Sequence, residues 1–94
     1  MWYVYILKCR DDSLYTGITN NPPHRLQAHN AGLGAKYTRS RRPVELVYLT
    51  AVENHSAALK LESEIKHLPR SSKLALIVAS AVKDQIDTEE HVHA

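Results

Sequence analysis

The densest group of cationic side chains in this sequence lies in one short stretch, and a tyrosine stands among them. The stretch contains Lys36, Tyr37, Arg39, Arg41 and Arg42. Guanidinium and ammonium groups suit contacts with phosphate, and a tyrosine ring can stack on a nucleic-acid base. One interpretation of this composition is a partner that carries phosphate. The alternative is a basic loop that faces only solvent.

Two tyrosines near the N-terminus stand in the short apolar runs YVYIL and LYTGIT, which a charged break separates. Runs rich in Val, Ile, Thr and Tyr on either side of a polar break predict a β-hairpin. Because side chains alternate between the faces of a strand, a loop with an odd number of residues would place Tyr5, Tyr15 and Gly17 on one face. A glycine there would let a ligand or another backbone approach closely. The alternative is a pair of tyrosines that only pack.

A short polar helix is predicted after the hairpin. The sequence Asn-Asn-Pro-Pro is typical of a helix start, so we expect a helix over His24 to Ala31 that ends near Gly32. Arg25 and His29 are four positions apart and therefore lie on one face of it. Isolated helices of this length are marginal, so the sheet must hold this one in place.

The remaining segments predict a small α+β fold. The stretch from Gly32 to Pro43 is expected to be a loop, Val44 to Ala51 a third strand, and Ala57 to about Leu68 a helix, with a last helix capped by Ser71 or Ser72. The apolar residues of the longer helix recur at helical spacing, at Ala58, Leu61, Ile65 and Leu68. We therefore expect a small three-stranded antiparallel sheet flanked by helices, in the order β-β-α-β-α-α.

The composition bounds the organisation of the chain. A length of 94 residues allows one domain, and a charged fraction of 23% is that of an ordinary soluble globule. No apolar run is long enough to span a bilayer. The single cysteine, Cys9, cannot form an internal disulfide, so we expect a cytoplasmic protein. One domain is expected over residues 1–83, followed by an acidic, flexible tail over 84–94.

The charge is distributed unevenly along the chain. The net charge is +2, but residues 1–73 carry +5 and residues 74–94 carry −3. A basic body with an acidic tail fits a polyanion as the partner of the body. This charge is also common in proteins that bind no nucleic acid.

Five separated motifs resemble those of the GIY-YIG nuclease domain. They are YVYIL followed by YTG, then NPPHRLQAHN, GAKYT and ALKLESEIK, and they occur in the family's order between Trp2 and Ile77. The resemblance is closest to small stand-alone bacterial members. Two positions depart from the pattern, because Tyr3 stands where the first motif has its glycine and Thr16 replaces the isoleucine of the second. Such changes occur among the small members.

The resemblance implies a set of site residues. Glu62 would hold Mg²⁺, with Mn²⁺ as a substitute, and Arg25 would grip the scissile phosphate. One tyrosine would activate water and the other would orient water or phosphate. His29 would assist that proton transfer or form a hydrogen bond with a tyrosine. A surface glutamate paired with Lys66 is the alternative reading of Glu62. The candidate catalytic residues are Tyr5, Tyr15, Arg25, His29 and Glu62, and the candidate nucleic-acid contacts are Gly17, Lys36, Tyr37, Arg39, Arg41 and Arg42.

The implied activity is that of a metal-dependent endonuclease that hydrolyses DNA phosphodiester bonds, with DNA repair or recombination as the expected setting. The expected partner is DNA, with a homodimer or a second protein as a further partner and no membrane. One alternative is a nucleic-acid-binding module of the same fold that is not catalytic or depends on a partner. Another is a protein-interaction domain whose basic loop binds an acidic partner. Duplex, flap, branched and single-stranded DNA and RNA all remain open as substrates.

Overall fold

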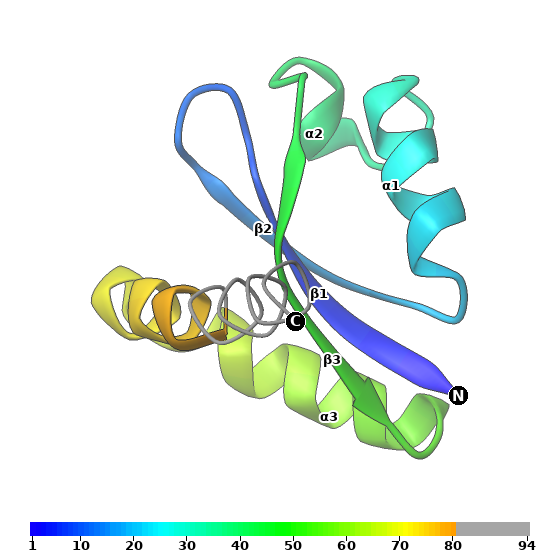
Figure 1. The fold of residues 1–94 in the computed structure, drawn as a ribbon, viewed down its shortest axis with the longest axis vertical. Helices are drawn as coiled ribbons and strands as arrows, with labels where there is room; N and C mark the ends of the chain where they lie inside the picture. The colour runs from blue at the N-terminus through cyan, green and yellow to red at the C-terminus, as the bar shows by residue number, and fades with distance from the viewer. Residues whose placement is uncertain (81–94) are drawn as a thin grey trace, which may run out of the picture.

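The structure is a computed structural model that describes residues 1–80. The end of the expected domain and the expected acidic tail, at 81–83 and 84–94, lie outside the described residues. A helix follows Pro69 and is described over residues 70–80. The other elements are β1 (Trp2–Lys8), β2 (Leu14–Thr19), α1 (Pro22–Asn30), α2 (Lys36–Arg39), β3 (Glu45–Val52) and α3 (His55–Lys66), as Figure 1 shows.

The three strands form one antiparallel sheet in the order β2-β1-β3. This confirms the expected α+β fold with helices around a three-stranded sheet. The loop of residues 9–13 joins β1 to β2, and Asp12 takes a left-handed conformation in it with φ 66°. Tyr5 pairs with Gly17 and Leu7 with Tyr15. The predicted odd-to-odd register is therefore confirmed, and both tyrosines share a face with Gly17.

The helix α3 covers one face of the sheet. Its buried residues Ala58 and Ile65 pack against Val4 and Ile6 of β1, and Leu76 and Ile77 of the following helix join the same core. The apolar stripe predicted for this helix is thus the one that faces the strands. Asn54 caps the helix by accepting a hydrogen bond from the backbone N–H of Ala57 at 2.8 Å.

A second, smaller core lies on the opposite face of the sheet, where α1 and α2 lie together away from α3 (Figure 1). Tyr5 and Leu7 are buried there together with Cys9 and Val44, and Leu26 of α1 packs against them. The side chain of Asn30 makes two hydrogen bonds to the backbone of Val44, at 2.8 and 3.0 Å. These bonds fix the end of α1 to the start of β3, so the face that carries Tyr5 is covered by α1.

Several boundaries differ from those expected. The first helix begins at Pro22 rather than His24, and α3 begins at His55 rather than Ala57, because the capping asparagine precedes each start directly. The helix of residues 70–80 begins before Ser71 and Ser72, so neither serine caps it as expected. The stretch expected to be a loop contains the one-turn helix α2, which is too short to show an apolar period. None of the described helices is both long enough and apolar enough to cross a membrane.

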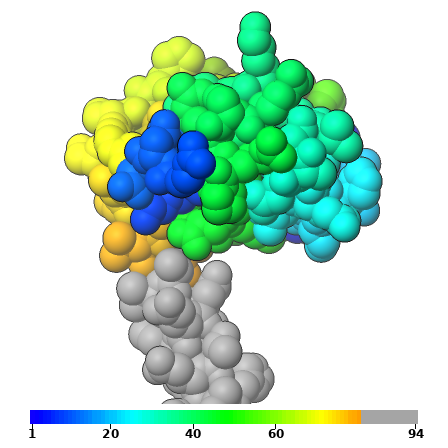
Figure 2. All heavy atoms as spheres, turned by 90° about the horizontal axis from the view of Figure 1, so that it is seen from above, coloured from blue at the N-terminus to red at the C-terminus, as the bar shows by residue number. Residues whose placement is uncertain are grey.

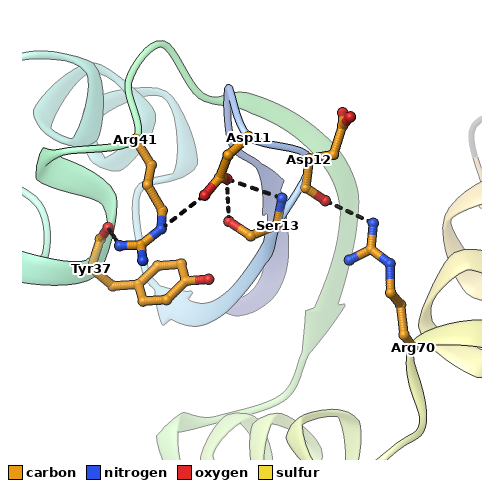
Figure 3. A network of polar contacts seen from close by, with 6 residues as sticks. All are labelled: Asp11, Asp12, Ser13, Tyr37, Arg41 and Arg70. Carbon is orange, nitrogen blue, oxygen red and sulfur yellow. Dashed lines mark hydrogen bonds and ion pairs between the residues drawn. The ribbon is translucent and has the colours of Figure 1, made fainter.

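Two arginines hold the loop between β1 and β2 from different sides (Figure 3). Arg41 donates from Nε to the Asp11 carboxylate at 3.1 Å, and Arg70 donates to the Asp12 carbonyl oxygen at 2.7 Å. Hydrogen bonds from Ser13, with the charge of Arg41 in addition, lower the pKa of Asp11. Figure 2 looks onto this end of the molecule, where the blue loop lies between green and yellow segments.

Candidate active site

The hydroxyl group of Tyr5 is the centre of a polar cluster between β1 and α1. It lies 2.9 Å from Nε2 of His29, and Nε of Arg25 donates to the same oxygen at 3.4 Å. Tyr5 and His29 are buried, with 3% and 0% of their surface exposed. Because Arg25 and His29 are one turn apart on α1, both reach the same strand residue.

The hydrogen bonds around His29 assign the proton on its ring. The Thr38 hydroxyl donates to the carbonyl oxygen of Ala35 at 3.2 Å, so it accepts the hydrogen bond that joins it to Nδ1 of His29 at 2.8 Å. Nδ1 therefore carries the proton, and Nε2 offers a lone pair. The Tyr5 hydroxyl consequently donates its proton toward Nε2 of His29.

Two residues that support this cluster, Thr38 and Gly34, are absent from the predicted site. Arg25 donates from Nη2 to the carbonyl oxygen of Gly34 at 3.1 Å. A Cβ at Gly34 would collide with the ring of His29, so only glycine allows the loop to approach so closely. Both residues belong to the motif GAKYT, which spans Gly34 to Thr38. This motif was the only feature of the sequence that pointed to a role for them.

Three further aromatic contacts extend the cluster toward the surface. The ring of Tyr15 lies edge-on to the ring of His29, with 5.3 Å between the centroids. Tyr37 stacks against Tyr15 at 6.0 Å, and the guanidinium carbon of Arg41 lies 4.0 Å from the centroid of the Tyr37 ring. Asp11 holds Arg41 in turn. The loop between β1 and β2 therefore helps to position the exposed ring of Tyr37 against Tyr15, which in turn contacts His29.

Glu62 comes from α3, which lies against the opposite face of the sheet. Its carboxylate is 3.5 Å from the Lys66 ammonium and is only 19% exposed. Its negative charge acts on the Tyr5 hydroxyl. Beside it, along the β2 edge, a hollow of about 220 Å³ is lined by Leu14, Tyr15, Thr16, Tyr37, Lys66 and Lys73. The two layers of the fold therefore meet at this edge, and the hollow brings tyrosines and lysines together.

Burial changes the proton affinities of the two central groups. Burial raises the pKa of Tyr5, although the hydrogen bond and charge of Arg25 partly offset this. Burial, with the charge of Arg25 in addition, lowers the pKa of His29 to about 4. In the free protein at neutral pH, the site therefore holds a neutral tyrosine and a neutral histidine.

Acid is expected to destabilise the protein through His29. Its pKa of about 4 lies below the ordinary value of 6.5, so the unfolded chain binds more protons between these two values. The free energy of unfolding should be constant above about pH 6.5 and fall by at most about 1.4 kcal/mol per pH unit toward pH 4. Urea unfolding at a series of pH values measures this, and the fall should be shallower in His29→Gln. Equal slopes in both proteins would contradict it.

A methyl group at Gly17 is expected to impair the site from the opposite strand. A Cβ there would stand 2.5 Å from the Tyr5 hydroxyl oxygen and 2.7 Å from the ring carbon that bears it. Tyr5 would have to move away from Gly17, which disturbs its hydrogen bond to His29, at a cost of about 1–3 kcal/mol in the free energy of unfolding. We expect Gly17→Ala to lower any cleavage rate about 100-fold. The substitution should add little in a Tyr5→Phe background; additive losses would show that it acts elsewhere.

The structure thus brings Tyr5, Arg25 and His29 into direct contact and places Tyr15 beside them. The residues predicted to contact nucleic acid lie at several different places in the structure. Gly17 lies beneath Tyr5 and Tyr37 lies over Tyr15, whereas Lys36 is exposed at the start of α2. Arg41 forms an ion pair with Asp11. Arg39 and Arg42 line a second hollow, apart from the one at the β2 edge. Arg10 also lines this second hollow, although the sequence analysis did not predict Arg10 as a site residue.

The comparisons with known proteins identify the family of this chain. The family described as the GIY-YIG catalytic domain matches residues 1–75. A UPF0213 protein of Clostridium perfringens is 55% identical over 85 residues, covering 90% of this chain and 91% of that protein. A UPF0213 protein of Oceanobacillus iheyensis is 60% identical over 75 residues, covering 80% and 87%.

A solved structure is similar as well. The solution NMR structure of a UPF0213 protein from Bacillus halodurans has a TM-score of 0.56 at 44% identity and covers 86% of this chain and 87% of that one. The matched region contains the whole polar cluster around Tyr5. The chain therefore belongs to the GIY-YIG catalytic domain family.

Proposed function

We propose that this protein is a metal-dependent endonuclease that hydrolyses DNA phosphodiester bonds, in DNA repair or recombination. The observation that carries the proposal is the Tyr5 hydroxyl group, held between a lone pair of His29 and the guanidinium of Arg25. A hydroxyl with a proton acceptor on one side and a fixed cation on the other suits proton transfer next to a phosphate. Membership of the catalytic domain family supports the same chemistry.

Tyr5 is the better candidate for the group that activates water. Its hydroxyl donates to His29, whereas the ring of Tyr15 meets His29 only edge-on. As Tyr5 accepts a proton from water, it can pass its own proton to Nε2 of His29. The lowered pKa of His29 opposes this transfer in the free protein. The negative charge of a bound phosphodiester would favour the protonated imidazole and so ease the transfer.

Arg25 suits the role of the phosphate ligand. Its Nε and one Nη already donate to Tyr5 and Gly34, so the plane of the guanidinium is fixed. A fixed guanidinium stabilises the charge that develops on the phosphate without having to reorient, which a flexible lysine does less well. The hollow along β2 adds two lysines and two tyrosine rings, which suit neighbouring phosphates and a stacked base.

Glu62 fits a divalent cation of the Mg²⁺ type. Mg²⁺ binds through one or two carboxylates and keeps water and phosphate oxygens as its other ligands. Glu62 supplies a partly exposed carboxylate, and residues 1–80 contain no group of three or more His, Cys, Asp or Glu that could form a complete cage. A cation bound there would stabilise the negative charge of the transition state.

A nuclease assay tests the proposal. The purified protein is incubated with plasmid, single-stranded, flap and branched DNA and with RNA, in Mg²⁺ or Mn²⁺ and in EDTA. We expect cleavage that needs the metal and that Arg25→Gln lowers about 100-fold or more. The matched control is Lys60→Gln, which makes the same charge change on a face of α3 away from Glu62 and should cleave like the wild type.

Two outcomes would overturn this assignment. Equal cleavage by the wild type and by Arg25→Gln would point to a contaminating nuclease. Salt-sensitive binding to these substrates without any metal-dependent cleavage would favour the non-catalytic or partner-dependent binding module instead.

A further inference from the structure

Three arginines converge on a hollow that the site described above does not use. The hollow has a volume of about 530 Å³, and its lining is Arg10, Asn30, Arg39, Ser40, Arg42 and Pro43. The arginines come from three separate segments: the loop after β1, the end of α2 and the loop before β3. No carboxylate belongs to this lining. Such a concentration of guanidinium groups suits an anion that can accept paired hydrogen bonds.

The three arginines differ in whether their guanidinium groups already form hydrogen bonds within the protein. Arg42 donates from Nε to the Arg39 carbonyl oxygen at 2.8 Å and from Nη1 to the Asn30 carbonyl oxygen at 3.4 Å, so it helps to shape the hollow. Within residues 1–80, the exposed guanidinium groups of Arg10 and Arg39 form no hydrogen bond and no ion pair. Their charges are therefore available to a ligand.

The other arginines at this end of the molecule behave differently. Arg41 binds the carboxylate of Asp11 and the carbonyl oxygen of Tyr37, and Arg70 binds the carbonyl oxygen of Asp12, as Figure 3 shows. Both hold the loop between β1 and β2 in place. Arg41 and Arg70 thus form contacts within the protein and do not line the hollow, whereas Arg10 and Arg39 do line it.

The hollow lies on a different side of α2 from the candidate active site. Tyr37 points to the β2 edge and stacks on Tyr15, whereas Arg39, two positions further along this short helix, lines the hollow. Thr38 between them is buried against His29. No residue lines both the arginine hollow and the hollow at the β2 edge. A ligand that occupies both must therefore extend past α2.

We propose that this arginine hollow, formed by Arg10, Arg39 and Arg42, is a second phosphate-binding site that holds the sugar-phosphate backbone of a nucleic acid away from the bond to be cut. The inference rests on the proposed function, which supplies nucleic acid as the substrate. The bound phosphate belongs either to a distant part of the cut strand or to a second strand. Both offer the same phosphodiester oxygens, so an experiment must separate them.

Salt titration of binding tests the second site. Glu62→Gln serves as the background so that no substrate is cut, and the probes are a fluorescent single-stranded 30-mer and a duplex of the same sequence. Each protein–phosphate contact contributes about 0.7 to 0.9 to the slope of log affinity against log salt concentration. We expect Arg10→Gln and Arg39→Gln each to reduce this slope by about one, and Lys60→Gln to leave it unchanged.

The two probes identify the strand. A reduced slope on both probes assigns the phosphate to the cut strand, and a reduced slope on the duplex alone assigns it to the second strand. Unchanged slopes on both probes would overturn the second site. Both substitutions are at exposed residues, and circular dichroism verifies that each variant is folded. If the wild type cleaves DNA but neither arginine substitution changes the salt slope, only the second phosphate-binding site is refuted. If the arginine substitutions reduce the slope but the wild type does not cleave, only the proposed nuclease activity is refuted.

Discussion

Replacing Tyr5 by phenylalanine is expected to lower the rate of DNA cleavage about 1000-fold while the protein remains folded. The substitution removes one oxygen atom, which accepts from Arg25 and donates to His29. General base catalysis contributes about 100- to 10,000-fold, so losing the base should remove a factor of this order. The buried Nε2 of His29 loses its partner, which should cost about 1–3 kcal/mol of stability.

Single-turnover cleavage measures this prediction, with binding of uncleaved DNA in EDTA as the second readout. Binding should be nearly unchanged, because phosphate contacts come from cationic side chains. Tyr48→Phe is the matched control, since it removes the same atom on the opposite face of the sheet, against α3. Tyr15→Phe should cost only about tenfold, because its hydroxyl forms no hydrogen bond within residues 1–80. A larger loss in Tyr15→Phe than in Tyr5→Phe would exchange the two roles.

The pH profile gives an independent check of the same group. The transfer through His29 starts from protonated Tyr5, whereas the phenolate of Tyr5 would accept the proton of water directly. Because burial raises the pKa of Tyr5, the phenolate fraction is small at neutral pH and grows up to tenfold per pH unit. We expect the cleavage rate of the wild type to rise between pH 7 and 9. A rate that stays flat over this range would exclude the phenolate as the base and leave the transfer from protonated Tyr5 to His29, and a rate that falls would exclude both.

The relative positions of the site residues within the hairpin and within α1 could be predicted from the regular geometry of strands and helices. Alternation along β1 and β2, with an odd loop between them, places Tyr5 beside Gly17. The pairing of Arg25 with His29 follows from helical spacing. Neither rule involves contacts between distant segments. The sequence therefore predicts both halves of the polar cluster, although the contact between them depends on how α1 packs on the sheet.

What could not be predicted depends on contacts between distant segments. Thr38 fixes the tautomer of His29, and Gly34 allows the loop to approach its ring. Neither residue type indicates such a role in sequence. The hollow with Arg10 is a further example, since Arg10 and Arg39 are far apart along the chain and only the fold brings them together. In the same way, the structure separates Arg41 from the arginines it neighbours in sequence.

Replacing Glu62 by glutamine is the second change from which we expect a very large effect. The substitution keeps the shape of the side chain and removes its charge. The ion pair with Lys66 is partly exposed, since the lysine is 52% accessible, so its loss should cost only about 0.5 kcal/mol of stability or less. A carboxylate that holds a catalytic cation is worth several kcal/mol in the transition state, so cleavage should fall more than about 1000-fold.

The Glu62→Gln substitution should affect DNA binding and DNA cleavage differently. Removing a negative charge from α3 should leave the binding of the DNA polyanion in EDTA unchanged or make it tighter, whereas cleavage is lost. The matched control is Glu64→Gln, which makes the same change at an exposed position on another face of α3 and should cleave like the wild type. If Glu62→Gln retains cleavage within about tenfold of the wild type in Mg²⁺, Glu62 is only the surface partner of Lys66. If cleavage and binding are lost together, its carboxylate acts on folding or on DNA binding, and the cation must be held elsewhere.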